Sequence, residues 1–427
     1  MSKLVLPLTP AQDWLMHYFR PPYKWYVYST FTIRTKLDLG IIQKIVANIL
    51  EYNEVLRIFL DNNDGKWSQW VIKNIDPKRV CPKIFVADMS KKVTFLEKKL
   101  IEEKAKSLNI NIWPLFYLIP IKISRDQYRI TFVLHHIIAD YVSCIFLYNQ
   151  FCIFHSNDCI PLVKKNHLYS DYCLRLQNLK RNPDVRKQVL SYWERERAQQ
   201  SAATEIEPSK LRGIYLKEFS VVATKALTNN ILRLAKKYYA VKSLHPILSA
   251  PLYVAVSCHN NHEKITISHK LHGRNLIKQN YFNMVGNCAI NVPITQNVRV
   301  GASFKKIVHS LSNKIEQMPL NGLGYDLFLD NWSLNMYPDN LVTDIRICYL
   351  GNINILNHLC TSIEYDKFSQ RYNDPRQPLT IPIEVVIFVH NNQFHIRTIY
   401  TQKCYSEDYI KTLTESYLEN LGKLFNE

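Results

Sequence analysis

Two adjacent histidines, followed four residues later by a carboxylate, stand at the end of an apolar run: Phe132-Val133-Leu134-His135-His136-Ile137-Ile138-Ala139-Asp140. The run before them predicts a strand over 128–134, and the apolar segment after them predicts a helix over 141–151, so the string falls on a connection. Connections held by rigid elements carry much catalytic chemistry. Imidazole titrates near neutral pH and can take a proton from an attacking amine or hydroxyl, while a carboxylate can fix the loop that aims it. We therefore interpret the string as a general-base site.

The two imidazoles are not equivalent. Successive side chains of a strand point to opposite faces, so His135 and His136 cannot both face one cavity if strand geometry persists through them. One histidine is expected to pack and the other to face the site. Asp140 has a second interpretation, as a buried structural pin paired with an arginine. A lone histidine is usually a satisfied or surface residue, but the composite string is rare enough by chance to favour the functional interpretation.

Other catalytic patterns are missing from the sequence. A zinc site needs three or four converging ligands, and the chain has no His-Glu-x-x-His string and no Cys-x-x-Cys pair, so no metal is expected. The chain also lacks the Gly-x-Ser-x-Gly turn of serine hydrolases and the Gly-x-x-x-x-Gly-Lys loop that binds phosphates.

At the histidine string the chain resembles a known family. His135, His136 and Asp140 match the His-His-x-x-x-Asp signature of the condensation domains of nonribosomal peptide synthetases and of the wider chloramphenicol-acetyltransferase-like acyltransferases. Further segments follow in the family's order over nearly the whole chain: Leu6-Pro7-Leu8-Thr9-Pro10-Ala11-Gln12, Asn53-Glu54-Val55-Leu56-Arg57, Gly65-Lys66-Trp67-Ser68-Gln69, His272-Gly273-Arg274, Met284-Val285-Gly286 through Pro293, and Tyr349-Leu350-Gly351.

Three positions depart from the family pattern. Asn53 stands where the family has a histidine, and Tyr141 stands where a glycine usually follows the motif aspartate. Ile290 replaces the family's asparagine, with Asn291 displaced by one position. The bulky Tyr141 is expected to narrow the channel or to shape the acceptor pocket.

The resemblance implies an α/β fold of two chloramphenicol-acetyltransferase-like α+β sandwich lobes, arranged as a V-shaped pseudo-dimer with a tunnel between them. It assigns His136 to hydrogen-bond, and in one version deprotonate, the amine, His135 to packing, and Asp140 to a salt bridge that shapes the loop. The candidate partners of Asp140 are Arg57 and Arg274, and the sequence does not choose between them. The structural and tunnel residues expected on this basis are Arg57, Arg274, Tyr141, Gly286 and Asn291.

The function implied by the resemblance is amide formation between an acyl or peptidyl thioester on a carrier protein and an amine, either free or itself carrier-bound. No cofactor is expected to be bound; the carrier protein delivers the phosphopantetheine arm. The chain contains no adenylation segment and no Gly-Gly-x-Ser carrier site, so we expect a freestanding enzyme that acts in trans, as a monomer, without membrane or nucleic acid. The resemblance thus implies an enzyme of secondary-metabolite biosynthesis.

Three alternatives stay open. An epimerase of the same superfamily shares the histidine string, but Lys270 and Leu271 stand where its catalytic glutamate is expected. A coenzyme-A-dependent acyltransferase is the second alternative. A basic nucleic-acid-binding protein, from a different class, would explain the charge but not the ordered motifs.

Length and composition fit a two-lobed protein. A chain of 427 residues with 47% hydrophobic residues exceeds what one core usually serves, and we expect an N-terminal lobe over 1–165, linker helices over 166–212 and a C-terminal lobe over 213–427. No uncharged apolar stretch of 18 residues and no signal-peptide core appears, and the ten scattered cysteines are interpreted as reduced, so a cytoplasmic location is expected.

The net charge of +18 favours an anionic partner. The densest basic stretch runs from Lys164 and Lys165 to Arg186 and Lys187, in a segment that predicts two helices separated at Pro183. It is either a solvated helix face or a surface for an acidic carrier protein.

Local patterns predict further elements. Thr9-Pro10-Ala11-Gln12 has the form of a capping box that begins a helix. Apolar spacing predicts helices over 39–50, 95–108, 227–238, 244–256 and 406–424, and strands over 216–222 and 265–269. A hairpin with Asn391-Asn392 at its turn is predicted over 383–400.

Overall fold

Residues 4–18, 25–87, 93–156, 168–200, 206–276, 279–299, 301–328, 343–352, 363–367, 371–372 and 378–425 are described by the computed structural model. They divide into two units, each assembled from separate stretches of the chain. Unit 1 consists of Met1–Leu179, Gln279–Cys288 and Ile353–Asp374, and unit 2 consists of Lys180–Lys278, Ala289–Asn352 and Pro375–Glu427. The lobe boundaries expected at 165 and 212 stay a prediction, and Lys164 and Lys165 lie outside the described residues.

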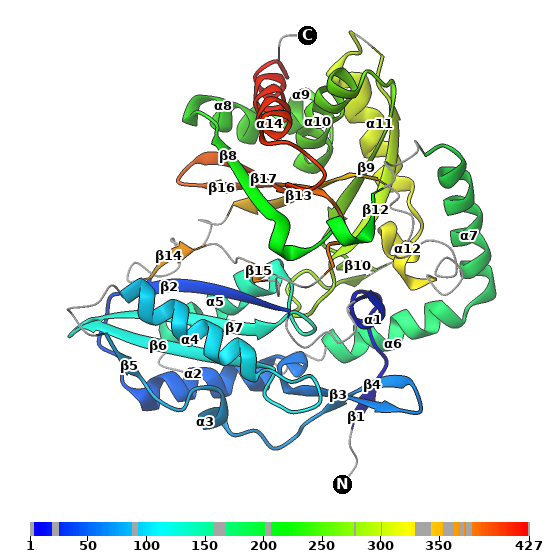
Figure 1. The fold of residues 1–427 in the computed structure, drawn as a ribbon. Helices are drawn as coiled ribbons and strands as arrows, with labels where there is room; N and C mark the ends of the chain where they lie inside the picture. Colours follow the sequence, from blue (N-terminus) through cyan, green and yellow to red (C-terminus); the bar gives the residue numbers. More distant parts are fainter. Residues whose placement is uncertain are drawn as a thin grey trace. The chain divides into compact units, whose positions relative to one another are not determined.

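Unit 1 is built on a mixed sheet with strand order β14-β2-β7-β6-β5, in which β15 also pairs with β2 (Figure 1). A second sheet has the order β1-β4-β3. The strands are β1 (Leu4–Leu6), β2 (Tyr26–Ile33), β3 (Ile58–Asn63), β4 (Lys66–Val71), β5 (Phe85–Val86), β6 (Phe116–Ser124), β7 (Gln127–His135), β11 (Gln279–Asn280), β14 (Ile363–Lys367) and β15 (Arg371–Tyr372). The helices are α1 (Pro10–Tyr18), α2 (Leu39–Tyr52), α3 (Pro77–Val80), α4 (Val93–Ser107), α5 (Tyr141–Ser156) and α6 (Leu168–Arg181).

Helices cover both faces of the main sheet of unit 1. On one face, residues of α4 pack against Tyr28 and Val133 of the sheet. On the other face, Phe31 contacts Phe151 of α5, with ring centroids 5.1 Å apart. Every residue of β2 is buried, as expected for a strand covered on both sides. The covering helices therefore fix the strand that pairs with β7 and, through it, the start of the histidine loop.

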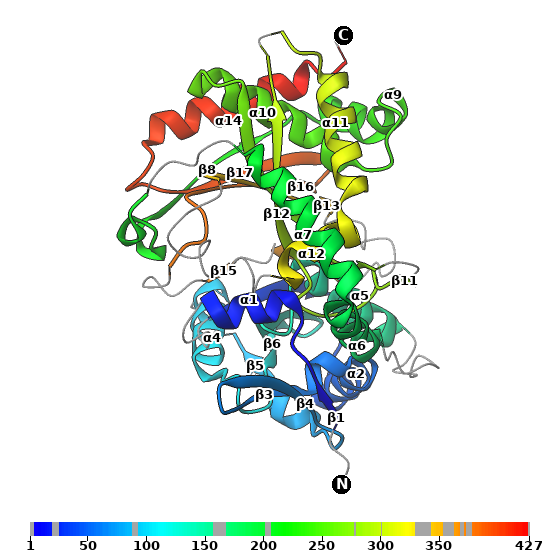
Figure 2. The ribbon, with the colours of Figure 1, turned by 90° about the vertical axis from the view of Figure 1, so that its right-hand side faces the viewer.

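Unit 2 contains a sheet of order β12-β9-β13-β16-β17-β8, with α10, α11 and α14 on one of its faces (Figure 2). The strands are β8 (Leu216–Val222), β9 (Lys264–Leu271), β10 (Asn275–Leu276), β12 (Ile290–Asn297), β13 (Ile345–Asn352), β16 (Ile383–His390) and β17 (Gln393–Thr401). The helices are α7 (Pro183–Ala198), α8 (Lys225–Asn230), α9 (Lys236–Tyr238), α10 (Leu244–Asn260), α11 (Phe304–Gln317), α12 (Leu323–Leu327) and α14 (Glu407–Gly422).

Most local predictions are confirmed. The Asn182 side chain accepts hydrogen bonds from the Asp184 and Val185 amides and so caps α7 after the break between two helices. Asn391 and Asn392 both have positive φ, 49° and 59°, as a tight hairpin turn between right-twisted strands requires. The helix predicted over 227–238 differs, because a π-helical stretch, Ile231–Ala235, separates α8 from α9. No helix among the described residues is long and apolar enough to cross a membrane.

A chain of three buried polar side chains crosses the core of unit 2. Tyr253 donates to the Ile294 carbonyl at 2.6 Å, so its oxygen can accept from Nε2 of His269 at 2.9 Å. Nδ1 of His269 must then accept from Nε2 of His245, also at 2.9 Å. This direction of donation requires a neutral His269, because Nδ1 of that ring accepts and so carries no proton. Burial lowers the pKa of His245 to about 4, and burial also lowers the pKa of His269 well below its ordinary value of 6.5.

Acid should therefore destabilise unit 2. In the unfolded state these histidines bind protons near pH 6.5, whereas in the folded state they stay neutral to lower pH. Their contribution to the unfolding free energy is therefore fully present above pH 6.5 and is lost as the pH falls towards 4. We expect His245 alone to account for about 3 kcal/mol of lost unfolding free energy over this range. Urea unfolding at several pH values measures this loss of unfolding free energy. The variant His245→Gln, which keeps a donor but cannot titrate, should show a shallower slope; a slope equal to that of the wild type contradicts the assignment.

Candidate active site

Strand pairing extends through both histidines of the loop. The His135 amide donates to the Leu115 carbonyl at 2.8 Å, on the β6 side of β7. The next amide, that of His136, donates to the Trp25 carbonyl at 2.8 Å, on the β2 side. Successive amides thus point in opposite directions, as in a regular strand, and the two side chains follow opposite faces.

His135 is held inside the protein by its own loop. Its side chain is fully buried, and Nδ1 accepts a hydrogen bond from the Ile137 amide at 3.1 Å. The Ile138 amide donates to the His135 carbonyl at 3.1 Å, which closes the turn after the strand. These bonds fix the ring and place its proton away from Nδ1.

His136 lies beside a pair of tryptophans, Trp25 and Trp14, of which Trp25 is in direct contact with it. Its ring meets the edge of Trp25, with centroids 4.6 Å apart and an interplanar angle of 64°. Trp25 in turn lies 6.2 Å from Trp14 of α1. Both residues are buried: His136 is 7% exposed and His135 is 0% exposed. Of the two residues, His136 is the less completely buried.

Asp140 caps a helix and holds a distant segment. One carboxylate oxygen accepts from the Ser143 amide at 2.9 Å, which satisfies a free donor in the first turn of α5. The other accepts from the Cys288 amide at 3.2 Å. The Ser143 hydroxyl lies 2.8 Å from Asp140 and also accepts from the Gly286 amide at 3.0 Å. The carboxylate therefore ties the start of α5 to residues 286–288 within unit 1.

Gly286 leaves little room for a side chain. A Cβ atom there would lie 3.2 Å from Cε2 of Tyr169 and 3.3 Å from the sulfur of Cys288. The contact that joins residues 286–288 to Ser143 depends on this close approach, which explains a glycine at the position.

Gln12 joins four segments of unit 1. Its side-chain Oε1 accepts from the Thr9 backbone amide at 2.9 Å, and its backbone amide donates to the Thr9 hydroxyl at 3.3 Å. The predicted capping box is therefore present. Its Nε2 faces the Ile137 carbonyl at 3.0 Å, the Tyr169 hydroxyl at 3.0 Å and Gln69 at 3.1 Å. Gln12 is fully buried. One amide thus links the first helix to the middle of the histidine loop.

The remaining predicted residues occupy separate surroundings. Tyr141 is the half-buried first residue of α5. Arg57 donates to the Ile72 carbonyl at 3.1 Å; burial lowers the pKa of its guanidinium, while Glu54 and Glu51 act in the other direction. Arg274 belongs to unit 2, where it is fully buried and donates to the His272 carbonyl at 3.0 Å.

Asn291 also belongs to unit 2, on β12 opposite Lys270 of β9. Its Oδ1 is buried and has no hydrogen-bond partner among the described residues. Burial raises the pKa of Asp326 to about 7, although the charge of Arg346 and a hydrogen bond from the Asn291 backbone amide favour the charged carboxylate. Lys270 donates to Glu384 at 2.8 Å.

Sequence reasoning missed several residues that build the loop. Ser143 stands three positions after Asp140, which is the spacing of a helix cap, so a local signal was present. Trp25, Tyr169 and Cys288 gave none, because their contacts join distant parts of the chain. The described residues contain no group of three or more His, Cys, Asp or Glu side chains placed to hold a metal ion.

Comparisons with known proteins agree with the motifs. A family model described as Condensation domain matches residues 2–427, which confirms the resemblance inferred from the sequence. Bacitracin synthase 3 of Bacillus licheniformis is 21% identical over 438 residues, covering 97% of this chain and 7% of that protein. Gramicidin S synthase 1 of Brevibacillus brevis is 21% identical over 449 residues, covering 97% of this chain and 39% of that protein. The chain thus spans well under half the length of these relatives.

Solved structures share the fold. The epimerization domain from the third module of tyrocidine synthetase B superposes with a TM-score of 0.84 at 17% identity, covering 100% of this chain and 97% of that one. The condensation domain from Monacolin K polyketide synthase superposes with a TM-score of 0.78 at 12% identity, covering 99% and 97%. These likenesses confirm the predicted mixed α and β fold with two lobes.

Replacing Gln12 tests whether its amide positions the histidine loop. Gln12→Met keeps the length of the side chain but removes the donor to the buried Ile137 carbonyl and the acceptor of the Thr9 amide, so we expect a loss of roughly 2–4 kcal/mol in unfolding free energy. Turnover should fall as well, because the loop that carries His136 loses its tie to α1. Urea unfolding and a product assay measure both. Gln188→Met, at an exposed position of α7, is the matched control; equal stability of the two variants contradicts the role.

Proposed function

We propose that this chain, which belongs to the condensation domain family, forms an amide bond between a carrier-bound acyl or peptidyl thioester and an amine. Condensation domains catalyse peptide-bond formation, an acyltransferase reaction. The observation that carries the proposal is the fixed position of His136, which is set by strand pairing on one side and by the Gln12 and Asp140 bonds on the other.

The reaction needs alignment and proton transfer. The amine nitrogen attacks the thioester carbon, the carbon–sulfur bond breaks, and the thiol of the carrier arm leaves. His136 takes the proton that the nitrogen loses and returns it to the departing thiolate, so charge and atoms balance. Amide formation from a thioester is downhill, and positioning of the two reactants provides most of the rate.

The neighbouring residues have positioning roles in this proposal. His135 packs and sets the turn, as its complete burial and its bond from Ile137 support. Asp140 shapes the loop by capping α5 and holding the Cys288 amide, and a salt bridge to Arg57 or Arg274 stays a prediction. Tunnel roles of Tyr141, Gly286 and Asn291 are proposed on the family resemblance.

The donor is proposed to arrive on a carrier protein. The sequence contains no Gly-Gly-x-Ser carrier site, so the phosphopantetheine arm comes from outside these residues. We propose a soluble amine as the acceptor, with a carrier-bound aminoacyl group as the second possibility. Supplying the acyl group on coenzyme A instead of a carrier tests the alternative donor.

Removal of the proposed base should abolish product without unfolding the protein. We expect His136→Ala to lower the rate of amide formation by roughly 10²-fold or more, since general acid–base groups contribute 10²–10⁴-fold. Intact-mass analysis of a loaded carrier incubated with a panel of amines measures the product. His262→Ala, at an exposed position of unit 2, is the control and should keep the wild-type rate. Wild-type turnover by a folded His136→Ala protein refutes the role.

A second candidate is epimerisation of a carrier-bound aminoacyl group, which the TM-score of 0.84 to an epimerization domain favours. Against it, Lys270 occupies the region where the epimerase glutamate is expected, and it pairs with Glu384.

Deuterated water separates the two reactions. An epimerase removes and replaces the α-proton, so a carrier-bound aminoacyl substrate would gain one deuterium, whereas a condensing enzyme leaves that proton in place. We expect amide product with an acceptor amine and no deuterium at the α-carbon. Mass spectrometry of the released aminoacyl group reads this directly. Deuterium uptake that depends on His136 would instead establish the epimerase.

A further inference from the structure

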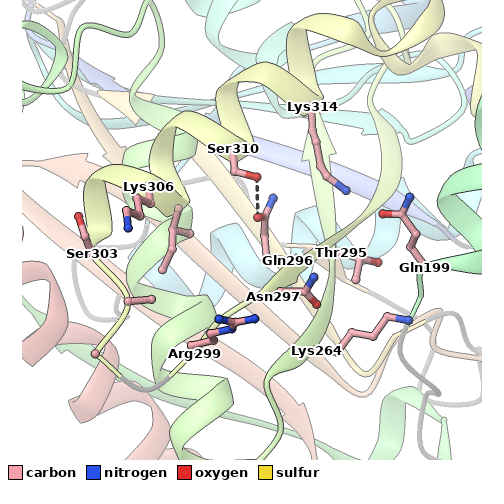
Figure 3. Close-up of a pocket in the computed structure, with 13 residues that line it drawn as sticks. Gln199, Lys264, Thr295, Gln296, Asn297, Arg299, Ser303, Lys306, Ser310 and Lys314 are labelled. Atoms are coloured by element: carbon pink, nitrogen blue, oxygen red, sulfur yellow. Dashed lines mark hydrogen bonds between the residues drawn. The ribbon is translucent and has the colours of Figure 1, made fainter.

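A basic hollow of about 850 Å³ lies on unit 2, beside β12, the start of β9 and α11 (Figure 3). Its lining contains four cationic side chains and no aspartate or glutamate. The lining cations are Lys264, Arg299, Lys306 and Lys314. A cavity with this lining attracts anions, because nothing in the wall neutralises the charge.

The secondary structure places these cations together. Asn297 at the end of β12 pairs with Lys264 at the start of β9, so both side chains belong to one end of the sheet. Lys306, Ser310 and Lys314 follow one another at intervals of four along α11 and therefore form a single stripe. The stripe extends about 12 Å, from the rise of 1.5 Å per residue. The adjoining face of the helix is apolar and packs inward, with Phe304, Ile307, Val308 and Leu311 buried.

Three of the four cations have no ion pair within the described part of the chain. Only Lys314 is paired there, with Glu196 of α7 at 3.0 Å. Lys264, Arg299 and Lys306 are exposed and share the hollow without a carboxylate. A second groove on α11 continues the positive surface and adds Lys305 and His309.

A buried amide supplies a neutral donor at the same place. Gln296 lines the hollow and is 5% exposed. The Ser310 hydroxyl donates to its Oε1 at 2.8 Å, which leaves Nε2 as a donor (Figure 3). Nε2 is buried and has no hydrogen-bond partner among the described residues. A buried donor without an acceptor costs free energy, and an oxygen of a bound ligand would remove that cost.

We propose that the hollow is a binding site for a small oligophosphate, an anion that carries two or more phosphate groups in a row. The 12 Å stripe of about two turns is longer than one phosphate needs, and three unneutralised cations match several negative charges. The start of α11 at Ser303 also lines the hollow and adds the positive end of a helix dipole. This site is separate from the histidine loop, which belongs to unit 1.

Calorimetry with tripolyphosphate on the full chain tests the site. We expect saturable binding of one ion per chain, and weaker binding of inorganic phosphate at the same ionic strength. The double variant Lys264→Gln, Lys306→Gln should raise the Kd about tenfold or more. The control Lys225→Gln, Lys411→Gln removes the same charge from exposed positions of unit 2 outside the hollow and should leave the Kd within about twofold.

Two outcomes would overturn the proposal. Equal weakening in both double variants would mean that tripolyphosphate responds to net charge and not to this hollow. Absence of saturable binding at millimolar tripolyphosphate would leave the basic surface to another kind of partner, such as an acidic protein. Equal Kd values for inorganic phosphate and tripolyphosphate would reject the oligophosphate class.

The pair between Lys314 and Glu196 provides an independent test that needs no change in the hollow itself. Glu196→Gln removes the negative charge that Lys314 now contacts, so the lysine becomes available and the Kd should fall several-fold. Glu194→Gln on the same helix, at an exposed position, is the matched control and should have a smaller effect. An equal gain in both variants, or none in either, contradicts a role for Lys314 in binding.

Discussion

The histidine loop depends on one buried primary amide, that of Gln12. Its oxygen closes the capping box that begins α1, and its nitrogen faces the Ile137 carbonyl in the middle of the loop, the Tyr169 hydroxyl of α6 and Gln69 of β4. The Tyr169 hydroxyl also donates to Gln69 at 2.7 Å, so the acceptors are linked to one another. Loss of any member would leave a buried polar atom unpaired, and this makes the arrangement specific.

Three independent restraints meet around the loop, and each acts on a different atom of it. Pairing with β6 and β2 fixes the backbone of His135 and His136, the amide of Gln12 fixes the carbonyl of Ile137, and the helix cap fixes Asp140. These three restraints act on the backbone of the two histidines, on the Ile137 carbonyl and on the Asp140 carboxylate, and not on the imidazole of His136. The proposed base is thereby positioned through backbone, amide and carboxylate atoms of the surrounding residues.

Local sequence patterns predicted the elements and failed for contacts that join distant residues. The sequence predicted three local features correctly, because each depends on residues within a few positions of each other. They are the capping box at Thr9, the cap at Asn182 and the turn at Asn391-Asn392. The bond from the Cys288 amide to Asp140 spans 148 positions, and periodicity carries no information about it. The sequence did not predict the basic hollow for the same reason, because its cations come from a strand, a loop and a helix that are separated along the chain.

The two units use polar networks that respond differently to acid. In unit 1 the network consists of amides and Tyr169, and burial raises the pKa of that hydroxyl well above 10, so none of these groups gains or loses a proton near neutral pH. In unit 2 the corresponding chain passes through His245 and His269. The direction of donation requires a neutral His269, and burial lowers the pKa of both imidazoles. A fall in pH therefore acts first on the core of unit 2, while the bonds of Gln12 that hold the loop in unit 1 stay intact. In the proposed reaction, proton exchange at His136 therefore leaves the Gln12 network that positions it intact.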